Sequence, residues 1–307
     1  MQSGIILCGV CKNVENTLPL IRKGFAEMVA KSDVPCWAVF YENNSHDKTA
    51  EYLSLWSNED CNVEVKCEIF TIEQEHARGY ARTYDNKPCR IEQIAYARNQ
   101  LMGMIESDTG PRSNAKYVVM IDMDNSVPLP VDLILKCIKR DPNGFDALIC
   151  NAGYDLYAYR DSNILFGPEL LPEFWSKKYL NYIRFSMQNN INLHYRNVFP
   201  YIPVTSGFNG LCIFRRDAIW GVRYSAIPTI EMNSEYEKIS QVLPKQNVVI
   251  GNGVYLFATN KKLGLFYLNN SGYNFPIVCE HVPFFARLRA RNCGRIYMCC
   301  DLIWYHK

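Results

Sequence analysis

The sequence has no long apolar run, no excess of one charge and no stretch of low complexity. Its formal net charge is +2, so charge alone points neither to nucleic acid nor to an anionic membrane as a partner. No window approaches the ~18 uninterrupted apolar residues of a membrane span, and the first residues lack a basic segment followed by an apolar one and a cleavage site. We therefore expect a cytoplasmic protein without a transmembrane segment, or one peripheral to a membrane.

Cysteine is abundant, but its pattern lacks the features of a disulfide scaffold. The 13 cysteines are odd in number and are scattered through apolar segments. This favours buried thiols in a reducing compartment. Cys8 and Cys11 have the C-x-x-C spacing, yet no second pair stands at zinc-finger spacing from them, so a metal or redox role is the weaker interpretation.

Apolar patterns in the first half alternate between the period of a strand and that of a helix. They predict a strand at 4–10, a helix at 18–29, a strand at 36–41, a helix at 46–56, a strand at 63–70, a helix at 90–107 and a strand at 117–121. The polar stretch 71–89 is predicted to be a loop. Alternating strands and helices imply an α/β fold with a mostly parallel central sheet of the nucleotide-binding type.

The second half of the sequence has a less regular apolar pattern. We predict a helix at 131–140, a strand at 146–152, long structured loops over 153–201, a strand at 210–214, a hairpin within 254–269, a helix at 283–291 and a strand at 295–300. Because no repeat, low-complexity tract or flexible linker interrupts the chain, residues 1–307 are expected to form a single domain with two subregions. The boundary between the subregions is placed at 125/126.

Two carboxylates, Asp122 and Asp124, directly follow the apolar strand predicted at 117–121. Open α/β sheets bind ligands just outside the carboxyl ends of their strands. When a nucleotide sugar transfers its sugar, negative charge builds on the departing diphosphate, and Mg²⁺ or Mn²⁺ held by one or two carboxylates stabilises it. We interpret the pair as metal ligands with Met123 pointing the other way, and surface or helix-capping aspartates are the alternative.

The stretch SGFNG (206–210) is predicted to belong to a sugar and acceptor site. Gly207 and Gly210 permit close approach of the backbone, and Asn209 offers both donor and acceptor atoms. A simple turn before the following strand is the alternative.

Five motifs stand in one order along the chain. They are VFYENNSHDKT (39–49), RIEQIAYARN (90–99), the Asp-x-Asp pair, YDLYAYRD (154–161) and SGFNGLCIF (206–214). Together they resemble the motifs of GT-A-fold glycosyltransferases, and within that fold they most resemble the fungal capsule-associated α-1,3-mannosyltransferase family, over residues 5–306. That family carries Asn-Asp where this chain has Asp-Met-Asp, which leaves the donor and the stereochemistry open.

The resemblance implies a metal-dependent glycosyltransferase. Its cofactor would be Mn²⁺ or Mg²⁺, and its donor a UDP- or GDP-sugar, with GDP-mannose among the candidates. Its acceptor would be a glycan or glycoconjugate, with retention of the anomeric configuration favoured. The donor contacts that it implies are Cys8, Val10, Asn13, Glu15, Glu42, Asn44, Ser45, Arg98, Asp122 and Met123.

Three of these donor contacts have plain structural alternatives. Asn44 and Ser45 belong to a stretch that also suits an ordinary turn followed by a helix cap. Arg98, in the middle of a predicted helix, suits a solvated helix face as well as a diphosphate site. Glu42 is less easily explained by capping.

The C-terminal residues Glu280, His281 and His306 complete the implied site. Glu280 stands at a predicted helix start, His281 follows it, and His306 lies beyond the last predicted strand. The resemblance implies that Glu280 and His281, with Asn209, are the catalytic residues, and that His306 is a third metal ligand beside Asp122 and Asp124. Capping of the helix is the alternative for Glu280, and a frayed terminus is the alternative for His306.

Two other classes of function are kept open. A sugar nucleotidyltransferase also needs a nucleotide-binding sheet and Mg²⁺, but the segment after the first strand is poor in glycine for a phosphate loop. A non-catalytic carbohydrate-binding protein would use some of the 20 Tyr and 5 Trp to stack on sugars, although it has no need of Asp122 and Asp124. The sequence leaves the acceptor, the linkage and the oligomeric state open.

Overall fold

The computed structural model describes residues 4–80, 87–107, 110–141, 144–170, 173–196, 201–242, 277–305 and four short strands between 248 and 265. The strands are β1 (Gly4–Cys11), β2 (Cys36–Asn43), β3 (Val63–Glu68), β4 (Ala115–Asp122), β5 (Ala147–Ile149), β6 (Tyr201–Pro203), β7 (Leu211–Arg215), β8 (Val248–Ile250), β9 (Gly253–Tyr255), β10 (Thr259–Asn260), β11 (Gly264–Leu265) and β12 (Ile296–Cys299). The helices are α1 (Leu18–Lys31), α2 (Thr49–Glu59), α3 (Ile72–Ala77), α4 (Arg90–Glu106), α5 (Val131–Lys139), α6 (Glu173–Arg196), α7 (Arg216–Ile219), α8 (Ile230–Val242) and α9 (His281–Ala290), with short 3-10 helices η1 (Pro111–Asn114) and η2 (Pro168–Leu170). Within these ranges, no helix combines the length and the apolar character needed to cross a membrane.

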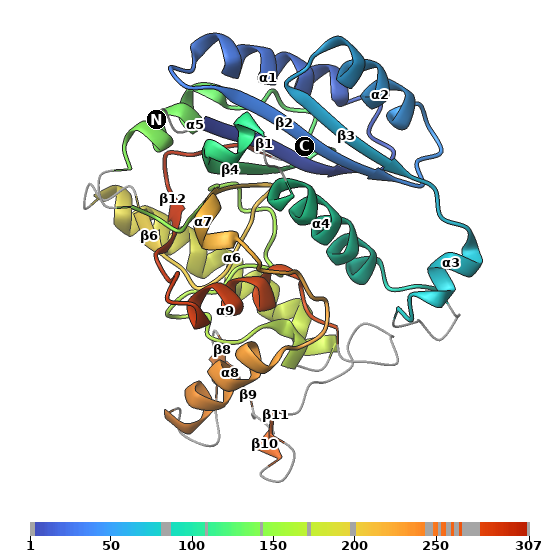
Figure 1. Cartoon of the computed structure of the whole chain (residues 1–307). Coiled ribbons are helices and arrows are strands. Elements are labelled where there is room, and N and C mark those ends of the chain that lie inside the picture. The colour runs from blue at the N-terminus through green and yellow to red at the C-terminus, as the bar shows by residue number, and fades with distance from the viewer. Residues whose placement is uncertain are drawn as a thin grey trace.

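An eight-stranded sheet in the order β3-β2-β1-β4-β7-β5-β12-β6 forms the centre of the fold (Figure 1). β1, β2, β3 and β4 run parallel, and β5 is parallel to β12, whereas β7 and β6 are antiparallel to their neighbours. The predicted α/β fold with a mostly parallel sheet is therefore confirmed. The small pair β10–β11 is antiparallel and falls inside the predicted hairpin.

Successive residues of the central strands enter two different cores. Ile5 and Leu7 of β1 pack with α1, α2 and α5, whereas Ile6 and Cys8 pack on the opposite face, which α4 covers. Strand side chains alternate between the faces of a sheet, so a strand covered on both sides is apolar throughout. For the same reason the C-x-x-C pair is split, with Cys8 in one core and Cys11 in the other.

The register of the parallel strands brings their carboxyl ends to one edge. Val10 pairs with Tyr41 on one side and with Asp122 on the other, and the next residue, Cys11, pairs with Glu42. The loops that follow β1, β2 and β4 therefore leave the sheet side by side. This edge is where polar residues of three separate segments meet.

The predicted long loop over 153–201 is wrong in its second part, because α6 occupies 24 residues of it. Tyr179, Ile183, Met187 and Ile191 are buried at intervals of four, which is a helical spacing that the surrounding Asn and Tyr residues obscure. Three further helices were not predicted, namely α3, α7 and α8. α3 lies in the predicted loop 71–89, where a Thr71 and Gln74 capping box starts it.

Candidate active site

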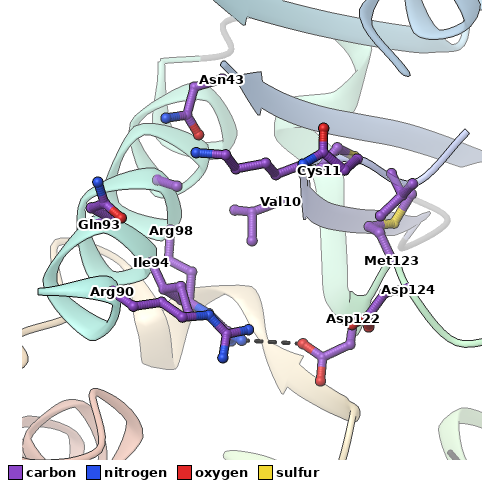
Figure 2. A pocket seen from close by; sticks show the side chains of 14 residues that line it. Val10, Cys11, Asn43, Arg90, Gln93, Ile94, Arg98, Asp122, Met123 and Asp124 are labelled. Carbon is purple, nitrogen blue, oxygen red and sulfur yellow. Dashed lines mark hydrogen bonds and ion pairs between the residues drawn. The ribbon is translucent and has the colours of Figure 1, made fainter. Parts of the chain in front are cut away.

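A cavity of about 480 Å³ opens at the edge where β1, β2 and β4 end (Figure 2). Its lining residues are Val10, Cys11, Lys12, Asn13, Val14, Asn43, Arg90, Gln93, Ile94, Ala97, Arg98, Asp122, Met123 and Asp124. The contribution of α4 recurs every three or four positions from Arg90 to Arg98, so it is a single helix face. The cavity thus combines an apolar wall, amide groups, cations on α4 and a pair of carboxylates.

The Asp122–Asp124 segment has the arrangement that the sequence predicts. Met123 is 2% exposed and belongs to the core, whereas Asp122 is partly exposed and Asp124 is exposed. Gly9 makes room for Met123, because a Cβ atom on Gly9 would stand 2.6 Å from the Met123 sulfur. The Thr17 hydroxyl also donates a hydrogen bond of 2.5 Å to the Met123 carbonyl. The buried methionine therefore anchors a carboxylate on each side of it at the cavity.

Arg98 is the charged centre beneath the cavity. Its Nη2 lies 3.3 Å from Asp122 Oδ1, its Nε lies 3.5 Å from Glu280 Oε1, and the side chain is 6% exposed. The guanidinium carbon stands 4.5 Å from the ring centre of Phe208 and 5.5 Å from that of Tyr224. Burial lowers the pKa of Arg98, but Glu280, Tyr224 and Asp122 outweigh it and raise the pKa above its usual range. Arg98 is therefore a fixed cation that links β4 to the start of α9.

Glu280 precedes α9 but makes no side-chain capping hydrogen bond. Its carboxylate is 9% exposed and faces Arg98 instead. The capping alternative thus does not describe its contacts. The pairing of residues so distant in sequence comes from the packing of α9 against the same part of the sheet as α4.

His281 is a buried neighbour of this ion pair. Its ring stacks on Phe208 with centroids 4.3 Å apart and meets Tyr224 edge to face at 5.6 Å. Neither ring nitrogen has a hydrogen-bond partner among the described residues, although Nε2 lies 3.6 Å from Glu280 Oε1. Burial and then the positive charge of Arg98 lower the pKa of His281 well below its usual range. The imidazole is therefore neutral and packs beside the cation.

A third carboxylate, Asp155, belongs to the same cluster, and the sequence did not single it out. Its Oδ1 accepts a hydrogen bond of 3.2 Å from the Ala158 N–H. Burial, followed by the charges of Glu280 and Asp122, raises the pKa of Asp155 to about 7. Burial and then the carboxylates at 122, 124 and 155 likewise raise the pKa of the neighbouring Tyr154 to about 12. Asp155 lies inside a quoted motif, but a single acidic residue in a turn has no period that would have marked it.

Asn209 positions Asp155. Its Nδ2 donates to the Cys150 carbonyl at 2.8 Å, and its Oδ1 accepts from the Asp155 N–H at 3.1 Å. Its backbone is left-handed, with φ of 57°, a conformation that Asn adopts more readily than most residues. Both ends of the amide are therefore engaged with the protein, and they fix the turn that carries Asp155 to the end of β5.

The loops after β1 and β2 are joined by side chains that bind backbone. The Asn13 N–H donates to Ser45 Oγ at 3.0 Å, and the His46 N–H donates to Asn13 Oδ1 at 2.8 Å. Farther along, the Lys48 N–H donates to Glu15 Oε2 at 2.8 Å. These bonds hold the two loops together at the cavity edge.

Glu42 and Asn44 shape the second of these loops from below. Glu42 is 1% exposed, and its Oε1 accepts from the Ser45 N–H at 2.8 Å. The amide of Asn44 exchanges hydrogen bonds with the backbone of Phe70, donating at 3.1 Å and accepting at 2.7 Å. The ordinary-turn alternative thus describes the contacts of Asn44 and Ser45. Asn43, which was not predicted, lines the cavity instead.

The structure brings together only part of the predicted site. Val10, Asn13, Arg98, Asp122, Met123 and Asp124 line the cavity. Glu280 and His281 lie beside Arg98, and Asn209 holds the turn of Asp155. Cys8, Glu15, Glu42, Asn44 and Ser45 are not among the lining residues. His306 lies outside the described residues. Sequence reasoning missed Lys12, Arg90 and Gln93, which only the helix face and the strand order bring to the cavity.

Asp122 and Asp124 are the carboxylates that the cavity offers to a cation. Within the described ranges, no three His, Cys, Asp or Glu side chains stand close enough to hold a metal ion together. Mg²⁺ and Mn²⁺ in nucleotide sites typically take one or two carboxylates and complete their shell with phosphate oxygens and water. The pair therefore suits an ion that arrives with a phosphate ligand.

Asp155→Asn should stabilise the metal-free protein at neutral pH. A carboxyl whose pKa is about 7 when folded and near 3.8 when unfolded destabilises the fold progressively as pH rises from about 4 to about 7. The advantage of the variant should therefore be absent near pH 4 and grow to roughly 1–2 kcal/mol by pH 7.5, after allowance for solvent screening. Urea unfolding in the presence of a chelator across this range measures it.

The matched control is Asp33→Asn, which removes an exposed carboxyl far from the cluster. It should leave the pH profile unchanged. If the free energies of unfolding of Asp155→Asn and the wild type differ by an amount that is constant with pH, then Asp155 does not interact with Asp122 and Glu280 as described.

No protein-family model matches the chain, and no curated protein matches its sequence. Among solved structures it is similar to the mannosyltransferase PcManGT from Pyrobaculum calidifontis in complex with GDP-Man and Mn²⁺, with 15% identity, a TM-score of 0.37 and coverage of 73% of this chain and 48% of that one. It is also similar to glucosyl-3-phosphoglycerate synthase from Mycobacterium tuberculosis in complex with Mn²⁺, UDP and glucosyl-3-phosphoglycerate, with 12% identity, a TM-score of 0.37 and coverage of 71% and 58%. For TarS of S. aureus the identity is 11%, the TM-score 0.36 and the coverage 72% and 50%. The chain thus spans about half the length of these proteins.

Proposed function

We propose that the protein is a GT-A-type glycosyltransferase that moves a sugar from a nucleoside-diphosphate sugar to a hydroxyl acceptor. The observation that carries the proposal is the cavity at the ends of β1, β2 and β4, where Asp122 and Asp124 share the lining with the buried Arg98 and the exposed Lys12 and Arg90. An anionic diphosphate with a divalent ion needs this combination, because the ion bridges carboxylates and phosphates while cations meet the remaining charge.

Asp122 and Asp124 would hold Mn²⁺ or Mg²⁺. When bound, such an ion neutralises charge that develops on the departing diphosphate. Lys12 and Arg90, both exposed at the cavity, would attract and orient the phosphates. The buried Arg98 holds Asp122 in place through their contact of 3.3 Å.

The apolar and amide groups of the cavity would receive the nucleoside. Val10 of β1 and Ile94 and Ala97 of α4 offer apolar surface, and Asn43 and Gln93 offer donors and acceptors to the edge of a base. Residues 1–125 would then bind the donor, and residues 126–307 the acceptor. The donor is proposed to be a UDP- or GDP-sugar, with GDP-mannose among the candidates, and the acceptor a glycan or glycoconjugate.

Glu280 is proposed to orient the reacting groups rather than to act as the base. The Glu280 carboxylate is buried and ion-paired with Arg98 at 3.5 Å, so a protein cation already holds it in place beside the cavity. This supports transfer with retention, since retaining enzymes on this fold largely work without a carboxylate base. ¹H NMR of the anomeric proton of the first-formed product tests it, and an inverted product would contradict it.

A thermal-shift panel of UDP-, GDP- and dTDP-sugars, each with and without Mn²⁺, tests the proposed function. A ligand that binds only the folded state stabilises it by about 2.7 kcal/mol at a hundredfold excess over Kd, or roughly 5 °C for a chain of this size. The sugar nucleotide with the correct base should raise the melting temperature by about this amount, and the increase should depend on Mn²⁺. Glycans that shift the melting temperature without any nucleotide doing so would favour a binding protein, and pyrophosphate release from a nucleoside triphosphate and a sugar 1-phosphate would favour a nucleotidyltransferase.

A further inference from the structure

Two cysteines from distant parts of the chain lie side by side behind the site. Cys137 of α5 and Cys299, the last residue of β12, have their sulfurs 3.7 Å apart although they are 162 positions apart in sequence. Both are unpaired thiols, and their residues are 5% and 2% exposed. A disulfide requires the sulfurs to approach to about 2.05 Å, so rotation of the side chains would have to supply about 1.7 Å.

A small hollow leads from the surface to both thiols. Its volume is about 10 Å³, and Cys137, Cys299, Leu133, Lys136, Arg140, Tyr201 and Asp301 line it. That volume is close to the space that one water molecule needs. Only an oxidant close to water in size, such as hydrogen peroxide, suits so small a space, whereas a thiol reagent of the size of glutathione does not fit it.

The two thiols differ in reactivity. A hydrogen bond joins the two sulfurs, and either can be its donor; it lowers the pKa of Cys299, although burial and Asp301 oppose this, and it raises the pKa of Cys137. The thiolate is the nucleophile in reactions of cysteine with oxidants. These directions favour Cys299 as the thiolate, and the separation of 3.7 Å places the Cys137 sulfur beside it.

We propose that Cys137 and Cys299 are a peroxide-oxidisable pair that closes into a disulfide between α5 and β12. The Cys299 thiolate attacks one oxygen of hydrogen peroxide, which breaks the O–O bond, forms the sulfenic acid and releases hydroxide. The Cys137 sulfur then attacks the sulfenic sulfur, the S–OH bond breaks, and the Cys137 proton leaves with the hydroxyl as water. Overall, two thiols are oxidised to one disulfide, and one peroxide is reduced to two molecules of water.

The disulfide would restrict the loop that follows Asp124. The Trp304 indole N–H, five residues after Cys299, donates to the carbonyls of Val127 and Pro128 at 3.0 Å each. Asn125 Nδ2 likewise donates to the Tyr305 carbonyl at 3.2 Å. The loop is thus already held by the segment after β12, and a covalent link from α5 to β12 would restrict it on its other side.

Mass spectrometry of the wild-type protein treated with limiting hydrogen peroxide tests the proposal. The intact protein should lose the mass of two hydrogens, digestion without reductant should yield a linked peptide containing Cys137 and Cys299, and dithiothreitol should reverse both changes. Cys137→Ser should form no such link and should instead accumulate the mass of one added oxygen, on Cys299. A bulky aromatic disulfide reagent should label neither thiol in the folded protein.

The wild-type digest decides the question even if a variant folds poorly. Recovery of Cys137 and Cys299 as free thiols, while exposed Cys61 or Cys67 is oxidised, would overturn the proposal. So would a link of Cys299 to Cys150 or Cys300. Hydrogen exchange tests whether the disulfide restricts the loop after Asp124. Exchange at residues 124–130 should be slower in the linked protein than in peroxide-treated Cys137→Ser. Equal rates would show that the disulfide does not restrict this loop. None of these readouts depends on sugar transfer.

Discussion

Asp124→Asn is expected to abolish sugar transfer while leaving the protein folded. The residue is exposed and directly follows the core residue Met123, so its carboxylate contributes to the cavity rather than to packing. The substitution keeps the shape and removes the charge that would hold the metal ion. Loss of one electrostatic contact to the charge that develops in the transition state usually costs about 10²–10³ in kcat, and loss of the ion should cost more.

The measurements are kcat/KM with the donor identified by the thermal-shift panel, and Mn²⁺ affinity by electron paramagnetic resonance. Asp132→Asn is the matched control, because this carboxylate lies exposed on α5 and pairs with Lys31. It should change neither quantity. Full wild-type activity in an excess of EDTA, or an Asp124→Asn enzyme with normal kinetics, would contradict the metal assignment.

Arg98→Met should destabilise the protein by about 3–5 kcal/mol, the usual cost of removing one partner from a buried ion pair. The variant removes the cation that Glu280 and Asp122 share, and Asp155 adds a third carboxyl group close to both. Urea unfolding at pH 7.5 measures the loss. The loss should shrink as pH falls, because the carboxylates that have lost Arg98 bind protons more readily in the folded state.

Two companion variants separate charge from geometry. Arg98→Lys keeps a cation but loses the planar fork that reaches two carboxylates, so its stability should fall between those of the wild type and Arg98→Met. Arg90→Met, exposed on the same face of α4, should change stability by no more than about 0.5 kcal/mol. An Arg98→Met protein within about 1 kcal/mol of the wild type at pH 7.5 would show that the cluster has another source of compensation.

The elements that the sequence predicted well are those with a simple period. β4 is apolar from Tyr117 to Ile121 because both faces are covered there, and α4 begins at Arg90 as its spacing predicts. By contrast, α6 buries one residue in four among many polar ones, so its pattern resembles that of a loop. The repeat of apolar residues is a local feature of the sequence, and it can be recognised only where one face of the element is buried along its length.

The sequence by itself determined the position of Asp122 and Asp124 at a strand end, because an apolar run followed by carboxylates is a local pattern. Only the tertiary structure decided that Arg98 joins Asp122 to Glu280, which lies 182 positions after Arg98 in the chain. It also decided that Asp155 enters the same cluster and that Cys137 meets Cys299. Such contacts depend on the order of strands in the sheet and on which helix packs over which end of it. The physical reason is that a charge or a thiol acquires its properties from neighbours that the fold supplies, and those neighbours leave no periodic trace in the chain.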